Sequence, residues 1–328
     1  MQILLTVSLP FFALIFCGYA AGRFRALSEP AIVGLNSFVF YFALPTLLFF
    51  KMAETPIMSQ FDWGFIAAYS GGGLVSFLVA AVLGRILFAS RLAENGLQGM
   101  AAACPNVGYL GLPLVIAVFG DRATLPAVMV IVFDLLILLP LPTLLIELDS
   151  GRGAPLRAIV AKVVTGLVKN PLIVATVAGA LCGIAGLALP VPLKAFGGLL
   201  GSAAAPCALF ALGASLIGKP ISDNMAEVGY LAACKLIVHP AAAALIGYEL
   251  LRLDPLLANI AIVEASLPIA ANVFVMARAY GYYVARTSTA ILVSTVAAVF
   301  TVSVLLVTLA PATDRHIIPI GPLQPAAK

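Results

Sequence analysis

Three ionisable side chains interrupt otherwise apolar stretches of this sequence: Asp134, Lys235 and Glu264. A charge inside such a stretch costs free energy unless it meets a partner, an ion or water. Glu264 could take a proton, bind a cation or pair with Lys235, and Lys235 could equally neutralise Asp134. His239 follows Lys235 by four residues on one helical face, which favours a packing role for both. Glu264, Asp134 and Lys235 are therefore predicted ion-binding candidates, with a buried structural ion pair as the alternative.

Two prolines and two glycines fall within ten residues of one apolar stretch, which runs through Asn106. An interior proline costs a helix about 3 kcal/mol, and each glycine adds about 1 kcal/mol. We expect the helix to unwind here and to leave backbone N–H groups free at a half-helix end, where an anion would bind. Asn106 would add a donor and an acceptor. The predicted binding residues of this segment are Pro105, Asn106, Val107, Gly108 and Gly111.

A second apolar stretch carries a related group of residues: Glu264, Pro268 and Asn272. Pro268 predicts a second interrupted helix, and Asn272 adds a side-chain amide close to it. For each helix alone, a simple proline kink is the alternative interpretation. Asn36, in another apolar stretch, could face the same ligand, with a cross-helix hydrogen bond as an equally good alternative.

The elements that must position these residues are membrane-spanning helices. The 328 residues are 62% hydrophobic and 10% charged, with a mean hydropathy of +1.12. A soluble domain is about 45–50% apolar and about 25% charged, so the solvent of this chain must be lipid. The net charge of +4 is too small to suggest a nucleic-acid partner. Apolar segments of about 20 residues lie at 3–22, 31–50, 63–88, 94–119, 123–146, 171–188, 193–217, 226–250, 255–281 and 284–309.

The loops differ in basic charge. Eleven Lys and Arg residues fall on one set of loops and six on the other. The positive-inside rule then places the connection 148–170 in the cytoplasm and both termini outside, in a cell inner membrane. No basic n-region precedes Arg23, so the first apolar segment is expected to be a retained span. The five cysteines show no metal-binding spacing, and no metal is expected.

The two halves of the sequence repeat short patterns at a nearly constant offset. Pro105 recurs as Pro268, 163 residues later, and three other matches have offsets of 161 to 165. Five spans per copy is an odd number, so the second copy must lie upside down in the membrane. Such inverted repeats are typical of secondary transporters. The predicted fold is all-α, with ten helices in two inverted five-helix repeats, 1–147 and 171–310, a linker at 148–170 and a tail at 311–328. A duplicated structural protein is the alternative.

These motifs resemble the auxin efflux carrier family, which includes plant PIN-type exporters and bacterial malonate-transporter-like proteins. The resemblance rests on the segment from Pro105-Asn106 to Gly111 and Pro113, on the segment from Ala261 to Pro268, and on shorter motifs elsewhere. It implies that broken helices 4 and 9 cross and that an elevator-like motion carries small organic anions. Helices 1, 2, 6 and 7 would form a scaffold, and helices 3–5 and 8–10 a transport domain. Two departures from the plant exporters matter: their long cytoplasmic loop is absent, and the plant pattern has an amide near Glu264 and a second proline near Val273. Auxin is therefore not the expected substrate.

The predicted function is secondary transport of small carboxylates, such as malonate-like dicarboxylates or aromatic acids. No cofactor is expected, and coupling to protons, to sodium or to neither is left open. A passive channel or a membrane sensor is the alternative. An intramembrane enzyme is disfavoured because no HExxH, GxSxG or paired-aspartate signature occurs. Two GxxxG pairs, Gly18–Gly22 and Gly179–Gly183, indicate close helix packing and leave open a homodimer through the scaffold.

Overall fold

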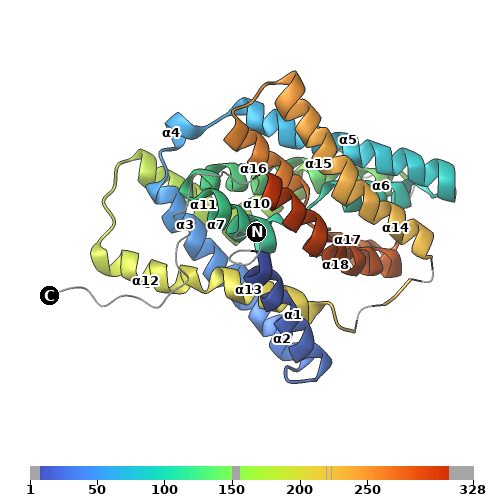
Figure 1. The fold of residues 1–328 in the computed structure, drawn as a ribbon, viewed down its shortest axis with the longest axis horizontal. Coiled ribbons are helices and arrows are strands. Elements are labelled where there is room, and N and C mark those ends of the chain that lie inside the picture. The colour runs from blue at the N-terminus through green and yellow to red at the C-terminus, as the bar shows by residue number, and fades with distance from the viewer. Residues whose placement is uncertain (1–7, 150–155, 219, 223, 310–328) are drawn as a thin grey trace.

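The computed structural model describes residues 8–149, 156–218, 220–222 and 224–309, and these residues are mainly helical (Figure 1). In the first half, the helices are α1 (Leu9–Arg23), α2 (Glu29–Phe38), α3 (Leu44–Glu54), α4 (Ile57–Gln60), α5 (Trp63–Phe88), α6 (Leu92–Ala103), α7 (Leu112–Phe119), α8 (Thr124–Phe133) and α9 (Pro140–Asp149). In the second half, they are α10 (Leu156–Lys169), α11 (Pro171–Ile184), α12 (Val191–Ser202), α13 (Ala204–Ser215), α14 (Met225–Ala233), α15 (His239–Ala244), α16 (Pro255–Ala265), α17 (Ala271–Tyr280) and α18 (Val284–Leu309).

Single π-helical turns join several of these helices into longer rods. Such turns connect α2 to α3 at Val39–Ala43, α8 to α9 at Asp134–Leu138, and α14 to α15 at Cys234–Val238. Six helical stretches are long and apolar enough to cross a membrane, and four shorter apolar helices accompany them. The chain is therefore a multi-pass membrane protein, as its composition predicts.

The predicted linker 148–170 contains a helix, α10, which spans Leu156–Lys169. The charges of Arg157, Lys162 and Lys169 predict a polar connection here. Valine and leucine residues recur between those charges at a helical period, and this spacing favours an amphipathic helix.

Polar side chains cap the N-termini of several helices. The Asp62 side chain accepts a hydrogen bond from Phe65 N at 2.8 Å at the start of α5. Asn170 accepts from Leu172 N at 2.9 Å at the start of α11, and Asp254 accepts from Leu256 N at 2.9 Å at the start of α16. These side chains satisfy N–H groups that have no partner within the helix.

Close glycine contacts bring together helices from the two halves of the chain. A Cβ atom on Gly18 of α1 would overlap the Phe210 backbone of α13, and one on Gly179 of α11 would overlap the Phe49 backbone of α3. Both GxxxG faces are thus covered by helices of the same chain, and a homodimer would need another surface. In Figure 1, α1, α2 and α13 lie together at the lower centre with α12 to their left, whereas α5, α6, α14 and α15 lie above and to the right of them.

Candidate functional site

Two interrupted helices meet at the centre of the site. One interruption separates α6 from a π turn (Val107–Gly111) that leads into α7, and the other separates α16 from α17. The broken segments pair antiparallel: Asn106 N donates to Pro268 O at 2.9 Å, and Ala270 N donates to Cys104 O at 3.0 Å. The two prolines therefore lie at one contact, where the backbone of each segment satisfies part of the other.

Side chains from neighbouring helices satisfy other backbone groups freed by the breaks. Ser76 Oγ of α5 donates to Ala102 O at 2.9 Å, and Ser294 Oγ of α18 accepts from Ile269 N at 3.1 Å. Lys235 Nζ donates to Ala265 O, the last residue of α16. A cation at a helix C-terminus is favourable because it opposes the negative end of the helix dipole.

Four backbone N–H groups beside the breaks have no acceptor among the described residues: those of Gly108, Tyr109, Ala271 and Asn272. They lie in the first turns of the two helical segments that follow the breaks, where helices lack internal acceptors. All four residues line one cavity of about 670 Å³. The cavity therefore meets two helix N-termini, and this arrangement favours an anion.

The cavity extends from the breaks to one end of the helix bundle. Its wall includes the C-terminal residue of α1 (Arg23), the cap of α11 (Asn170) and the end of α13 (Ser215). Arg23 is the one Lys or Arg among the described residues of the wall, and Asp134 is the one acidic residue there. Other polar residues of the wall are Tyr19, Asn36, Asn106, Tyr109, Asn272, Ser288 and Thr289.

The predicted binding residues divide into two groups. Pro105, Asn106, Val107, Gly108, Asn272 and Asn36 line the cavity. Gly111 and Pro268 do not, because Pro268 faces the other broken segment and Gly111 packs against Glu264. Asn36 Nδ2 donates to Ile32 O of its own helix at 2.9 Å, so its carbonyl oxygen remains for other donors.

The ion-binding candidates form a buried cluster behind the cavity. Asp134 reaches the wall and accepts a hydrogen bond from Tyr69 Oη at 3.1 Å. Lys235 is fully buried, lies 3.1 Å from His239 Nδ1, and interacts electrostatically with both Asp134 and Glu264. Both carboxylate oxygens of the buried Glu264 lack a hydrogen-bond partner among the described residues. Nowhere in the described part of the chain do three metal-ligating side chains converge.

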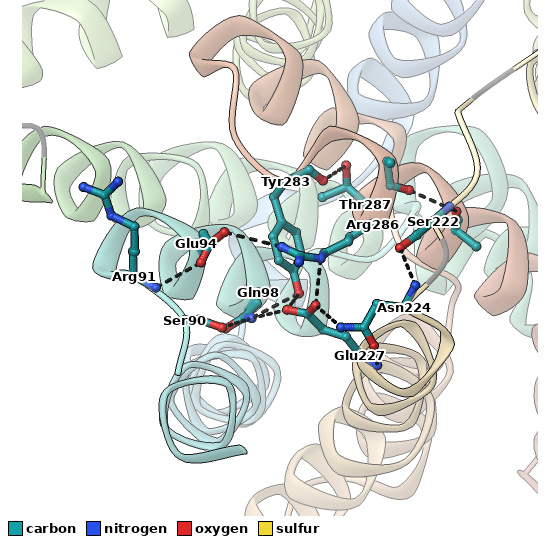
Figure 2. A network of polar contacts seen from close by, with 12 residues as sticks. Ser90, Arg91, Glu94, Gln98, Ser222, Asn224, Glu227, Tyr283, Arg286 and Thr287 are labelled. Atoms are coloured by element: carbon teal, nitrogen blue, oxygen red, sulfur yellow. Dashed lines mark hydrogen bonds and ion pairs between the residues drawn. The ribbon is translucent and has the colours of Figure 1, made fainter. Parts of the chain in front are cut away.

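A second polar network joins the ends of four elements (Figure 2). Gln98 Nε2 lies 2.8 Å from Ser90 Oγ and 3.0 Å from Glu227 Oε1, and Arg286 Nε lies 2.7 Å from Glu227 Oε2. Tyr283 donates to Glu227, and burial together with this hydrogen bond raises the pKa of Tyr283 above its usual value. The network ties α6, α14 and α18 to the loop after α5, so it fixes these helix ends relative to one another.

Arg23, Tyr19, Ser288 and Thr289 are not among the residues predicted from the sequence. Arg23 follows directly on an apolar segment, where a basic residue ordinarily indicates membrane orientation. Ser288 and Thr289 lie in a serine- and threonine-containing helix with no motif. Only the packing of α1 and α18 around the breaks identifies these four residues as part of the wall.

Comparison with known proteins identifies the family. The membrane transport protein family matches residues 3–306. A protein of Rhizobium meliloti (strain 1021) named "Putative malonate transporter" is 33% identical over 91% of this chain and 93% of its own length. "Uncharacterized transporter YfdV" of Escherichia coli (strain K12) is 25% identical over 86% and 90%. "Auxin efflux carrier component 8" of Arabidopsis thaliana is 27% identical over 46% and 42%.

These matches agree with the motifs around the two breaks and with the resemblance found in the sequence. They also exclude the enzyme alternative, because the family is one of transporters. The chain belongs to the membrane transport protein family, that of the auxin efflux carriers, and is a multi-pass membrane transporter.

Proposed function

We propose that this transporter carries small organic anions, with a substrate carboxylate bound where the two broken helices cross. The observation that carries the proposal is the set of four unpaired N–H groups of Gly108, Tyr109, Ala271 and Asn272 on one cavity wall. The side-chain amides of Asn106 and Asn272 add donors there. Malonate-like dicarboxylates are the first candidates because the Rhizobium relative bears that name, and aromatic acids are the second.

The inverted repeat is part of this proposal, and paired contacts support it. Gly18 packs on Phe210, and Gly179 packs on Phe49. From Gly18 to Gly179 and from Phe49 to Phe210 the offset is the same, 161 residues. A two-fold pseudo-symmetry axis in the membrane plane would produce such reciprocal contacts, and inverted repeats with a central site are a common transporter plan.

The proposed motion is of the elevator type. The scaffold would comprise α1 to α3 and α11 to α13, and the transport domain would comprise α5 to α9 and α14 to α18. Helices α1 and α13 pack together, as do α3 and α11, whereas α5 packs with α6, α15 and α16. The crossing belongs to the transport domain, while Arg23 and Asn36 approach the cavity from the scaffold. A substrate at the crossing would therefore exchange scaffold contacts as the domain moves.

The proposed orientation follows from charge. The cavity reaches the ends of α1 and α13, on the side richer in lysine and arginine, so the structure would face the cytoplasm. Glu264, Asp134 and Lys235 are the proposed coupling residues, because they lie directly behind the crossing. Imposed pH and sodium gradients across a vesicle would identify the coupled ion.

Uptake of labelled organic acids into proteoliposomes tests the proposal. Asn106→Ala should raise the KM for the best substrate about 10- to 100-fold, because hydrogen bonds to a charged group are lost. Asn259→Ala is the matched control: Asn259 is partly buried, bonds Tyr248 and Leu309 O, and does not line the cavity. Saturation and counterflow would separate a carrier from a channel. Uptake of no acid by the unmodified protein would refute the proposal.

A further inference from the structure

We propose that Arg23 binds a second carboxylate of the transported anion and so makes the cavity selective for dicarboxylates. This inference rests on the proposed function, because it assumes that a first carboxylate is held at the crossing. It assigns a substrate-selecting role to a residue of α1, outside the broken helices.

Arg23 is an exposed residue that differs from the other cations of the described chain by its place on the cavity wall. Four of those other cations form ion pairs: Lys51 with Asp121, Arg91 with Asp149, Lys194 with Glu54, and Arg286 with Glu94 and Glu227. The guanidinium of Arg23 has neither an ion-pair partner nor a hydrogen-bond acceptor in the part of the chain that the structure describes. It is the one basic side chain on the described cavity wall. An unpaired guanidinium in a ligand cavity is available for an anionic ligand group.

The packing of α1 against α13 brings Tyr19 and Arg23 to the cavity wall. Gly18 and Gly22 lie against Phe210 and Ala214 of α13, which also packs against the π turn after the first break. Tyr19 and Arg23 are one helical turn apart, about 6 Å along the axis, and both line the cavity. Arg23 thus lies at the end of α1 on the wall of the same cavity as the crossing.

The charges of the cavity then fit a dianion. A carboxylate at the crossing can accept hydrogen bonds from the free N–H groups there, but it leaves Arg23 unpaired. A second carboxylate on the same molecule gives the guanidinium a bidentate partner, for which its planar fork is well suited. Asp134 is the one acidic residue of the described wall, and it is held by Tyr69 on the transport-domain side. A dicarboxylate therefore matches both positive positions, while a monocarboxylate matches one.

The test compares two ligands and three variants in proteoliposomes. Unlabelled malonate and malonamate, in which an amide replaces one carboxylate, compete with labelled malonate for uptake. The unmodified protein should prefer malonate by about 10- to 100-fold. Arg23→Gln should reduce this preference to about threefold or less and leave inhibition by malonamate unchanged. Arg23→Lys should give an intermediate preference, because it keeps the positive charge but loses the bidentate hydrogen bonds of the guanidinium.

Arg25→Gln is the matched control. It removes the same charge two residues further along the chain, but Arg25 does not line the cavity, so the full preference should persist. A full preference in Arg23→Gln, or equal inhibition by both ligands in the unmodified protein, would overturn the inference. If Arg23→Gln does not fold, an undiminished preference in Arg23→Lys would overturn it. Uptake of monocarboxylates alone would refute the inference and keep the proposed function, whereas uptake of no acid would refute the proposed function itself.

Discussion

At the residue scale, the buried cluster behind the cavity shows how a membrane protein can hold ionisable side chains away from water. Lys235 Nζ donates to Ala265 O and lies 3.1 Å from His239 Nδ1, and it interacts electrostatically with Asp134 and Glu264. The helix end and the two acidic residues therefore depend on one basic side chain. This arrangement explains why a lysine can remain at 0% exposure in the middle of an apolar helix.

Replacement of that lysine should be strongly destabilising. Lys235→Met removes the amino group while it keeps most of the side-chain volume, so Ala265 O loses its donor and two buried acidic residues lose their basic neighbour. We expect a loss of about 3–5 kcal/mol in the free energy of unfolding, measured as a lower thermal unfolding midpoint in detergent. The double variant Lys235→Met/Glu264→Gln should recover part of this loss because one carboxylate is then neutral.

Lys194→Met provides the comparison, since Lys194 forms an exposed ion pair with Glu54 at 3.1 Å. Exposed pairs contribute about 0–1 kcal/mol. A Lys235→Met protein no less stable than Lys194→Met would show that the cluster does not need its cation.

At the element scale, the two breaks persist because neighbouring helices supply what the broken backbone lacks. Ser76 on α5 bonds a freed group of the first broken segment, and Ser294 on α18 bonds one of the second. A break without such partners would leave buried polar groups unsatisfied. The prolines interrupt the helices, and the serines satisfy backbone groups that the interruptions leave unpaired.

Two serines of α5 allow this dependence to be measured. Ser76→Ala removes a donor that reaches Ala102 O and Cys234 O, so the unfolding free energy should fall by about 1–3 kcal/mol. Ser70 lies in the same helix and is also buried, but its hydroxyl has no partner among the described residues. Ser70→Ala should therefore be neutral or stabilising. Thermal unfolding of both variants in detergent is the measurement, and equal effects would contradict this account.

The sequence predicts both breaks, because Pro105 and Pro268 interrupt helical hydrogen bonding whatever packs around them. It also predicts the helical segments closely, since lipid exposure imposes long apolar runs. It does not predict Arg23 or Ser288 as wall residues, because their positions depend on how α1 and α18 pack. Gly111 illustrates the reverse case: its motif predicts a ligand contact, but the structure shows packing against the Glu264 carboxylate.

At the scale of the whole molecule, the orientation in the membrane can be tested with single cysteines. The charge distribution predicts that the loop after α1 faces the cytoplasm and that the loop after α11 faces outward. In a cysteine-free background, a membrane-impermeant maleimide applied to intact cells should label Leu187→Cys but not Ala26→Cys. Both positions are exposed in the structure. Permeabilised cells should show labelling of both, and the opposite pattern in intact cells would reverse the orientation.

The antiparallel pairing at the crossing also has a consequence for biogenesis. The N–H of Asn106 finds its acceptor, Pro268 O, only in the second half of the chain, and Gly18 packs on a helix that is likewise made later. The first five apolar segments are therefore synthesised before the partners of the Asn106 N–H group and of the Gly18 surface. Until the ninth apolar segment is inserted, the first broken segment lacks its backbone partner. An insertase or a membrane chaperone could protect the nascent chain in this state.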